Sequence, residues 1–368
     1  MRDNAEKGDQ QMKTKKWLAL TLVFVLVLGV LAGCGNAANE NNGTQGNNSG
    51  TTGGESGDQA AQGEKRVFKI AHIAPESHAF TVGMQAWKEE LEKATDGRLS
   101  LEIYPGAQLG NEPDYLQQMQ AGTLDMAWVT IAEMGNRSES FNAWFMPFIV
   151  SNHDEAFELA HTDEAMAFYD TLDPSEGVYG LGYVFAGMRH LLFKDPVVDV
   201  DDLQGKKIRV TPNPAITEWW SSLGAGPTPV PLPELYTAFQ TGVVDGMDID
   251  LDALISSKFY EVGKQFTQTN HISWPAAALI SQKTWDSLSD EDKQIVQDTF
   301  AAAEKVLLEE NKKREETNLQ AFKDAGGTVN QIDRAAFAEK EAAFLEKYSA
   351  KGAEIKAFID KAKEISGQ

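Results

Sequence analysis

Cysteine and positive charge are both scarce in this sequence of 368 residues. Cys34 is the only cysteine, so no disulfide can form within the chain. Lysine and arginine together number 33 against 55 aspartates and glutamates, which gives a formal net charge of −22. A nucleic-acid partner requires a basic surface, so this balance argues against such a partner. It also argues against a broad electrostatic attachment to anionic lipid, but it is compatible with a local cationic pocket.

Enzyme signatures are missing as well. The chain has no GxGxxG, GxxxxGK[ST], HExxH, GxSxG or CxxC motif, and its six histidines show no metal-ligand spacing. The alternating Asp248, Asp250 and Asp252 resemble the start of a calcium loop, but Ala253 and Phe259 stand where such a loop needs glycine and glutamate. We therefore expect no metal, no cofactor and no catalysis. A secreted hydrolase or lyase that uses carboxylates of a cleft is kept as an alternative.

Residues 1–34 are expected to form a signal peptide. Lysines precede an apolar run from Trp17 to Val30, which is shorter than the roughly 18 residues of a membrane-spanning helix. The run leads into Leu31-Ala32-Gly33-Cys34, which resembles the lipobox of bacterial lipoproteins. This resemblance implies that Cys34 carries a diacylglyceryl anchor after cleavage. The alternative is an ordinary signal peptide with an incidental cysteine.

Residues 35–64 are rich in Asn, Gly, Thr, Ser and Gln and contain almost nothing apolar. Such a segment buries too little surface to offset its ordering entropy, so we expect a flexible tether that spans on the order of 30 Å. Together with the lipid anchor, it predicts a domain held at the outer face of the cytoplasmic membrane.

Strand and helix patterns alternate from residue 65 onward. Strand patterns occupy residues 66–74, 99–105 and 124–130, and helix patterns occupy about 80–94 and 113–122. This alternation predicts parallel βαβ units and an α/β sheet covered on both faces.

The sequence contains one internal repeat. MQAGTLD at Met119–Asp125 returns as FQTGVVD at Phe239–Asp245, each copy at the end of a helix pattern and the start of an apolar strand pattern. The copies are 120 residues apart, which exceeds the period of solenoid repeats and favours two similar lobes.

A long helix and a final helix are expected in the last third of the chain. The first begins after Ser289, which can serve as its N-cap, and ends at Gly326-Gly327. It is long enough to cross both lobes. The second runs from Arg334 to about Glu364 with a weak break at Gly352.

The stretch GKKIRVTPN, residues 205–213, alternates apolar and polar side chains as a half-buried strand does. Arg209 on this strand has two interpretations from the residues alone. It lies on a solvated face, or it presents a guanidinium to an anion in a cleft.

Several ordered segments resemble the solute-binding subunits of tripartite ATP-independent periplasmic (TRAP) transporters. These segments are YPGAQLGNEPDYLQQMQAGTLDMAWV, FMPFIVSN, residues 205–248, KFYEV and TNHI. The resemblance covers nearly all of residues 65–368 and implies a two-lobed, periplasmic-binding-protein-like α/β fold with the ligand between the lobes and a long helix bridging them. Lobe I would comprise about 65–186 and 275–315, and lobe II about 187–274 and 316–368.

The resemblance also implies a set of ligand contacts. In this family, an arginine on the strand after LxGxK holds a ligand carboxylate, and here that arginine is Arg209. Arg189 lies where many members have a second cleft arginine, although it could instead pair with an acid. Weaker predicted contacts are Trp128, Thr130, His72, Phe145, Asp248 and Trp274. Trp219 and Trp220 are expected to be packing residues.

One position departs from some members of the family. Sialic-acid binders have an asparagine shortly after VDG, where this chain has Ile249 beside Asp248. The departure favours a smaller, less hydroxylated acid, such as a dicarboxylate, a keto acid or an aromatic acid. The expected partners are an organic carboxylate and the small and large membrane subunits of a TRAP transporter, driven by an ion gradient. A binding protein of an ATP-driven importer, or a sensor, is the first alternative.

Overall fold

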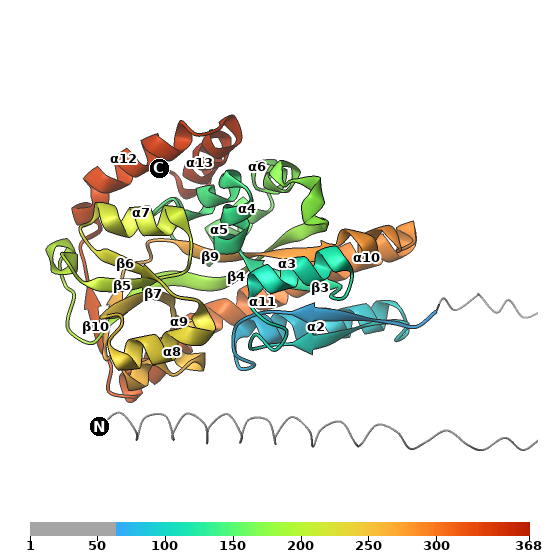
Figure 1. Cartoon of the computed structure of the whole chain (residues 1–368), viewed down its shortest axis with the longest axis horizontal. Helices are drawn as coiled ribbons and strands as arrows, with labels where there is room; N and C mark the ends of the chain where they lie inside the picture. Colours follow the sequence, from blue (N-terminus) through green and yellow to red (C-terminus); the bar gives the residue numbers. More distant parts are fainter. Residues whose placement is uncertain (1–63) are drawn as a thin grey trace, which may run out of the picture. The chain divides into compact units, whose positions relative to one another are not determined.

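The computed structural model describes residues 64–368 (Figure 1). The predicted signal peptide, Cys34 and nearly all of the predicted tether lie outside the described residues. Within residues 64–368, no helix is both long and apolar enough to cross a membrane.

Lobe I is built on a parallel three-stranded unit with the order β2-β1-β3. Each strand is followed by a helix, as the alternating sequence pattern predicts. The elements are β1 (Arg66–Ala71), α2 (Ala79–Ala94), β2 (Leu99–Tyr104), α3 (Glu112–Ala121), β3 (Met126–Thr130) and α4 (Ile131–Arg137).

Lobe II repeats this arrangement with the order β6-β5-β7, again parallel. Its elements are β5 (Lys207–Val210), α7 (Pro214–Ser222), β6 (Gly226–Pro229), α8 (Leu232–Thr241), β7 (Gly246–Asp250) and α9 (Leu251–Ser256). The expectation of two similar α/β lobes is therefore confirmed.

Two antiparallel strands join the lobes into one sheet. These strands, β9 (Ser273–Ser281) and β4 (Val178–Phe193), give the order β2-β1-β3-β9-β4-β7-β5-β6. Residues 178–188 of β4 pair with β9, whereas residues 189–193 pair with β7. The register shifts between Phe185 and Met188, where Gly187 has a φ of 145°. This irregularity falls at the predicted boundary between lobes, which supports the proposed division at residue 187.

The last aspartate of each repeat copy makes the same hydrogen bond in both lobes. A carboxylate oxygen of Asp125 accepts a hydrogen bond of 2.9 Å from the backbone N of Lys69 in β1. Asp245 does the same, at 2.8 Å, for the backbone N of Lys207 in β5. Each aspartate therefore fixes the start of the third strand of a lobe against the first strand.

The helix α11 (Asp290–Asp324) contacts α2 and α5 (His153–Ala160) of lobe I as well as β4 and α9 (Figure 1). The Ser289 side chain caps it by accepting from the backbone N of Asp292 at 3.1 Å. The predicted long helix that bridges both lobes is therefore confirmed.

The C-terminal segment contains two α-helices where one broken helix was predicted. A short 3-10 helix, η6 (Arg334–Phe337), precedes α12 (Ala338–Ser349). Gly352 has an extended backbone and is the N-cap of α13 (Ala353–Ser366). Phe344 of α12 packs on Trp219 of α7, whereas α13 packs on α5 and on η1 (Glu139–Phe145). These helices touch both lobes, so the assignment of residues 316–368 to lobe II stays a prediction.

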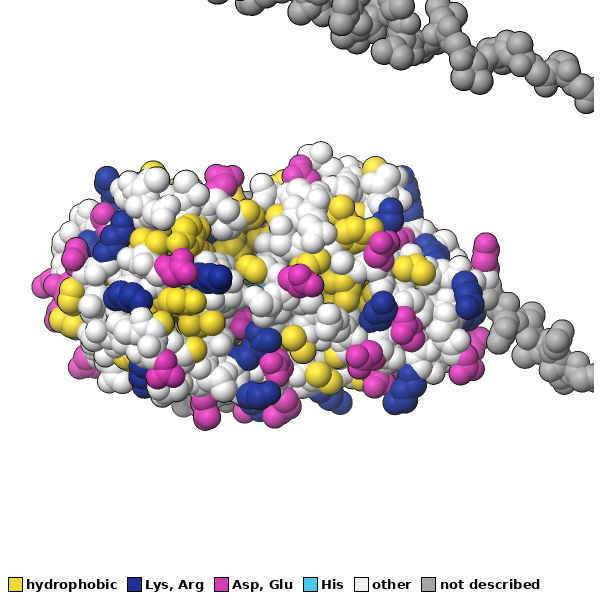
Figure 2. All heavy atoms as spheres, turned by 90° about the horizontal axis from the view of Figure 1, so that it is seen from below, with side chains coloured by type: hydrophobic (Ala, Val, Ile, Leu, Met, Phe, Trp, Pro, Cys, Tyr) yellow, Lys and Arg dark blue, Asp and Glu magenta, His cyan; other side chains and the backbone are white. Residues whose placement is uncertain are grey.

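The remaining elements are short. They are α6 (Asp163–Met166), η2 (Ala167–Thr171), η3 (Pro174–Glu176), η4 (Val200–Leu203), η5 (Phe259–Glu261), β8 (Gln265–Gln268), α10 (Gln282–Asp286) and β10 (Thr328–Gln331). Trp219 and Trp220 are fully buried, which confirms them as packing residues. On the face drawn in Figure 2, acidic and basic side chains are interspersed with smaller apolar groups.

The glycine of each repeat gives a test of the helix-to-strand junctions. Gly122 and Gly242 end α3 and α8 in the left-handed conformation, with φ of 80° and 79°. At Gly242, an added Cβ would meet no atom within 4 Å, so a Gly242→Ala substitution reports the backbone cost alone. We expect Ala to lower the free energy of unfolding by about 1 kcal/mol in denaturant titrations. Gly242→Asn should lose less, because asparagine tolerates this conformation. If the Gly242→Ala protein were as stable as the wild type, the left-handed conformation assigned to residue 242 would be wrong.

Candidate functional site

The carboxyl ends of the parallel strands of both lobes meet at one cavity of about 30 Å³. Lobe I contributes Ile73, Ala74, His78, Phe80 and Thr130. Lobe II contributes Arg209, Thr211, Leu232, Ile249, Asp250 and Ala253. The joining strands contribute Ala186, Arg189 and Trp274. In open α/β sheets, ligands bind at this edge, beside the point where the strand order reverses.

Arg209 is the charged group of the cavity with the fewest partners. Its side chain is 1% exposed, Nε donates to the carbonyl of Val230 at 2.9 Å, and Nη1 donates weakly to the carbonyl of Asp248 at 3.4 Å. Nη2 donates to none of residues 64–368. Burial, reinforced by the charge of Arg189, lowers the pKa of Arg209 to about 9. The site is therefore short of negative charge at this guanidinium.

Arg189 is fully paired, in contrast. Its Nε donates to a carboxylate oxygen of Asp248, Nη2 donates to the Asp248 carbonyl, and Nη1 donates to Asp250 at 3.3 Å. The guanidinium also lies over the ring of Trp274 at 3.9 Å. Arg189 lines the cavity, but the chain itself neutralises its charge, and its contact with a ligand stays a prediction.

Asp248 lies behind the cavity wall at the centre of this buried network. Besides Arg189, it accepts from Trp220 Nε1 at 2.9 Å and lies 3.2 Å from His271 Nε2. Burial acts to raise the pKa of Asp248, but Arg189 and His271 bring it well below its usual value. Its carboxylate thus stays ionised and orients Arg189.

Thr130 lines the cavity and is held by a buried carboxyl that the sequence did not reveal. Its hydroxyl donates to Glu112 at 2.9 Å, and its backbone N donates to the other carboxyl oxygen. Glu112 is 7% exposed, and burial raises its pKa to about 7 despite these hydrogen bonds. Arg209 is near enough to lower the pKa of Glu112 slightly.

Three other predicted contacts face away from the cavity. Trp128 packs edge-on against Phe80 at 5.4 Å, between α2 and α11. His72 is fully buried beside Thr81, with Nε2 3.0 Å from the hydroxyl, and burial lowers its pKa to about 3. Phe145 stacks behind Trp274 at 5.3 Å. These three side chains pack behind the residues that line the cavity, whereas Trp274 itself lines the cavity.

The sequence did not single out His78, Thr211 or Asp250 on the wall. Asp250 lies the same 120 residues after Thr130 that separate the repeat copies, so each ends the third strand of its lobe. Extending the repeat by five residues would have found it. His78, as the N-cap of α2, and Thr211, directly after β5, also mark strand-to-helix turns.

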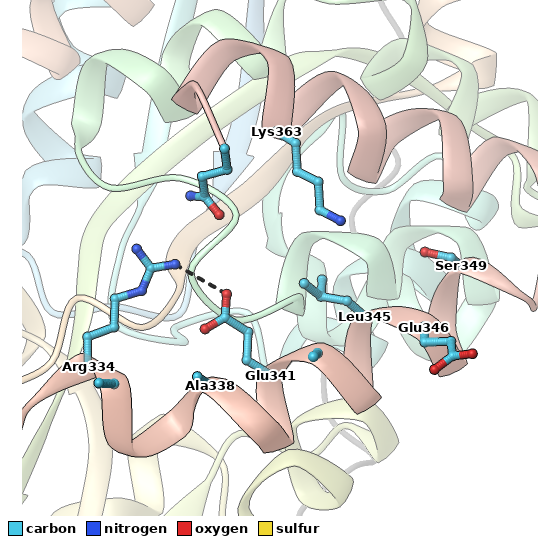
Figure 3. Close-up of a pocket in the computed structure, with 10 residues that line it drawn as sticks. Arg334, Ala338, Glu341, Leu345, Glu346, Ser349 and Lys363 are labelled. Atoms are coloured by element: carbon cyan, nitrogen blue, oxygen red, sulfur yellow. Dashed lines mark hydrogen bonds and ion pairs between the residues drawn. The ribbon is translucent and has the colours of Figure 1, made fainter.

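A wider depression of about 620 Å³ lies between η6, α12 and α13 (Figure 3). Arg334 Nη2 donates to Glu341 at 3.2 Å, whereas Glu346 is exposed and Lys363 is half-buried. The depression offers no buried group in need of a partner. We therefore place the functional site at the smaller cavity between the lobes.

The chemistry of the cavity suits anion binding. A guanidinium is a planar donor that stays charged and matches a carboxylate through two parallel hydrogen bonds. Among residues 64–368, no group of three or more His, Cys, Asp or Glu could hold a metal ion.

Comparison with known proteins identifies the family. Residues 70–351 match the family described as bacterial extracellular solute-binding protein, family 7. A solute-binding protein of Roseobacter denitrificans is 31% identical over 281 residues, which are 76% of this chain and 85% of that protein.

Two crystal structures of similar proteins share the fold. A sugar acid binding protein of Advenella mimigardefordensis in complex with galactonate is 25% identical with a TM-score of 0.78, over 82% of this chain and 99% of that one. A TRAP periplasmic solute-binding protein of Sulfitobacter sp. NAS-14.1 with bound β-D-galacturonate is 28% identical with a TM-score of 0.74, over 80% and 98%.

The chain therefore belongs to family 7 of the bacterial extracellular solute-binding proteins, the family of TRAP transporter binding subunits. The resemblance noted in the sequence and the predicted two-lobed α/β fold are both confirmed.

The raised pKa of Glu112 predicts a pH-dependent stability. A carboxyl whose pKa is higher in the folded than in the unfolded state stabilises the fold at low pH, and this contribution is lost as the pH rises toward 7. Between pH 5 and pH 8, the ligand-free wild type should lose on the order of 3 kcal/mol more unfolding free energy than Glu112→Gln. Chemical denaturation of both proteins at the two pH values measures this difference. If the unfolding free energies of the two proteins changed equally between pH 5 and pH 8, the raised pKa of Glu112 would be excluded.

Proposed function

We propose that this protein captures an organic acid between its lobes through Arg209 and delivers it to the membrane subunits of a TRAP transporter. The observation that carries the proposal is the buried guanidinium whose Nη2 donates to none of residues 64–368. A buried charge without a partner is costly, and a ligand carboxylate offsets that cost. In this proposal the protein binds and releases its ligand without chemistry, and the name of a relative, a solute-binding protein, supports this.

The ligand class that the cavity favours is a hydroxylated monocarboxylic acid, such as a uronate or an aldonate. Arg189 is neutralised by Asp248 and Asp250, so Arg209 is left as the cation that can hold one carboxylate. Thr211 and Asp250 on the wall offer oxygen atoms to ligand hydroxyls. The similar proteins with bound galactonate and galacturonate support this class.

This proposal differs from the expectation drawn from Ile249, which favoured a less hydroxylated acid. Ile249 does line the cavity and supplies no hydrogen bond to a ligand from its side chain. However, its neighbour Asp250 and the threonines supply the polar atoms that the missing asparagine would have provided. A dicarboxylate would bring a second negative charge toward Asp250, so we expect it to bind more weakly.

Closure of the lobes completes the proposed binding cycle. A cavity of about 30 Å³ holds about one water molecule, which is far less than a six-carbon acid occupies. The lobes must therefore separate for the ligand to enter and then close around it. The register shift in β4 at Gly187 is a suitable place for this hinge.

Substitution of Arg209 tests the carboxylate contact. In isothermal titration calorimetry, Arg209→Ala and Arg209→Lys should each weaken binding of D-galacturonate or D-galactonate at least tenfold, because lysine keeps the charge but loses the paired geometry. The melting temperature without ligand should stay nearly unchanged. A thermal-shift screen of uronates, aldonates and C4 dicarboxylates first identifies the tightest probe.

Two controls define the outcome of the Arg209 experiment. Arg334→Ala removes a half-exposed, ion-paired arginine of the wider depression and should leave binding unchanged. D-galactose lacks the carboxylate and should bind wild type and Arg209→Ala equally poorly. Undiminished binding of the acid by Arg209→Ala would refute the proposed role.

We also propose that Cys34 anchors the protein by lipid at the outer face of the cytoplasmic membrane. The lipobox-like sequence before Cys34 supports this proposal. A Cys34→Ala chain should move from the membrane fraction to the aqueous fraction in cells. Cys34→Ser provides a second variant that removes the thiol, and membrane retention of either variant would rule out the anchor.

A further inference from the structure

Asp252 connects the two lobes at the rim of the cavity without lining it. It belongs to α9 of lobe II and is 5% exposed. One carboxylate oxygen accepts a hydrogen bond of 2.6 Å from the backbone N of Ala79, the first residue of α2 in lobe I. The other oxygen accepts from Arg314 at 2.8 Å and from Asn318 at 3.0 Å, both on α11. One carboxylate thus contacts lobe II, lobe I and the bridging helix.

The contact with α2 has an electrostatic reason. The N-terminus of a helix carries partial positive charge and unpaired N–H groups, which an acidic residue in the first turn usually satisfies. The first turn of this helix, which has 16 residues, contains no acidic residue. Asp252 supplies the missing negative charge from the opposite lobe.

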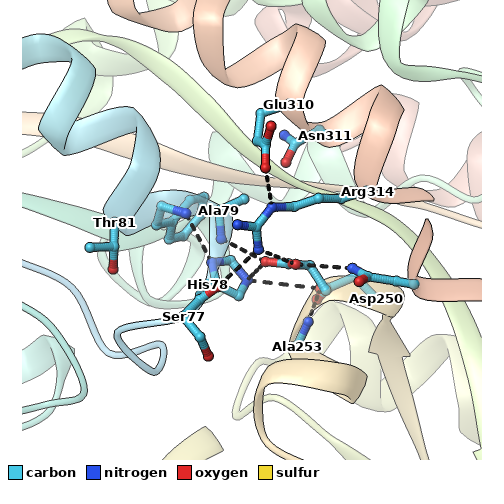
Figure 4. A network of polar contacts seen from close by, with 12 residues as sticks. Ser77, His78, Ala79, Thr81, Asp250, Ala253, Glu310, Asn311 and Arg314 are labelled. Carbon is cyan, nitrogen blue, oxygen red and sulfur yellow. Dashed lines mark hydrogen bonds and ion pairs between the residues drawn. The ribbon is translucent and has the colours of Figure 1, made fainter. Parts of the chain in front are cut away.

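Arg314 extends the contact to the other side of the interface (Figure 4). Its Nη1 also donates to the carbonyl of Ser77 at 2.9 Å, just before α2, and its Nε donates to Glu310 at 2.7 Å. The guanidinium therefore joins a carboxylate of lobe II to a carbonyl of lobe I.

His78 completes the cluster between Asp252 and Asp250. Its Nδ1 accepts from the backbone N of Phe80 at 3.1 Å, which places the proton of the neutral ring on Nε2. Nε2 lies 3.4 Å from Asp252 and 3.9 Å from Asp250. Burial acts to lower the pKa of His78, but the two aspartates outweigh burial and the charge of Arg314 and raise it.

The equivalent contact between the lobes, at the start of α7, involves only uncharged groups. Asn213, the N-cap of α7 in lobe II, donates to the carbonyl of Ala132 in lobe I at 3.0 Å and to Asn142 at 2.8 Å. The charged contact between the lobes is therefore the one at Asp252, which also binds α11.

We propose that Asp252 is a positioning residue for ligand capture, because its carboxylate holds the lobes closed without touching the ligand. The inference rests on the proposed solute-binding function. The contact with Ala79, and the bridge that Arg314 makes between Asp252 and the carbonyl of Ser77, require both lobes to be together, so losing them lowers the population of the closed form. The apparent affinity then falls by the same factor, since ligand contacts to both lobes need that form.

Asp252→Asn tests the proposal because it keeps the side-chain shape and removes the charge. We expect the dissociation constant for the acid selected by the screen to rise about tenfold in calorimetry. A nitroxide or dye pair at Lys93→Cys in lobe I and Val243→Cys in lobe II, in a Cys34→Ala chain, should report a longer mean distance in Asp252→Asn without ligand.

Asp292→Asn is the matched control. Asp292 pairs with the partly buried Arg98 within lobe I, so its loss removes a comparable ion pair that does not cross between lobes. It should change the melting temperature but neither the label distance nor the dissociation constant. If Asp252→Asn unfolds, Arg314→Gln removes the same contact from α11 and is expected to give the same two changes.

The outcomes separate this inference from the proposed function. If wild type binds none of the screened acids, the proposed function fails, while the label distances in ligand-free wild type and Asp252→Asn still test the lobe contact. If the folded Asp252→Asn or Arg314→Gln protein keeps the wild-type distance and affinity, the positioning role is overturned. An equal loss of affinity in Asp292→Asn would also overturn it, because the effect would then reflect general destabilisation.

Discussion

Among residues 64–368, the fold buries the guanidinium of Arg209 without a carboxylate hydrogen-bonded to it. Arg189 is neutralised by Asp248 and Asp250, and Arg314 by Asp252, but Arg209 has only carbonyl partners among residues 64–368. A surface arginine would be satisfied by water, whereas a buried one requires an anion or remains costly. In the function that we propose, the two lobes enclose this group around a bound acid and expose it when they separate.

The pseudo-symmetry of the lobes explains how one backbone plan yields an asymmetric site. Thr130 and Asp250 end equivalent strands and occupy the N-cap positions of equivalent helices, yet one is a neutral hydroxyl backed by Glu112 and the other is a carboxylate paired with Arg189. The backbone thus fixes where polar groups face the cavity, and the residue types decide which part of a ligand each can hold. This division allows members of one family to recognise different acids.

Ligand contacts and lobe contacts act on the same equilibrium. Arg209 lies on lobe II, so a ligand that also contacts Thr130 or His78 on lobe I favours the closed form. The carboxylate of Asp252 favours that form through bonds within the protein. A contact of this kind lowers the binding energy that the ligand must supply for closure.

The sequence by itself determined the first strands and helices, the long helix and the repeat, because these follow from local periodicity and capping residues. The role of Arg209 came from the family resemblance, since the residues alone left two interpretations. The sequence also indicated the two lobes, since the repeat at residues 119–125 and 239–245 marks equivalent junctions. It did not determine which side chains reach the cavity. Trp128 within β3, His72 after β1 and Phe145 at the end of η1 all face the core, while His78 and Asp250 were not predicted as contacts.

Only the tertiary structure decided how the charges are distributed. Asp248, Asp250 and Asp252 are alike in the sequence, yet they serve separately to orient Arg189, to line the cavity and to join the lobes. Their arginine partners lie about 60 residues away along the chain, and the choice among these partners depends on strand pairing across the sheet and on the path of α11. Local sequence specifies where a carboxylate stands, but the cation that neutralises it is set by packing between distant segments.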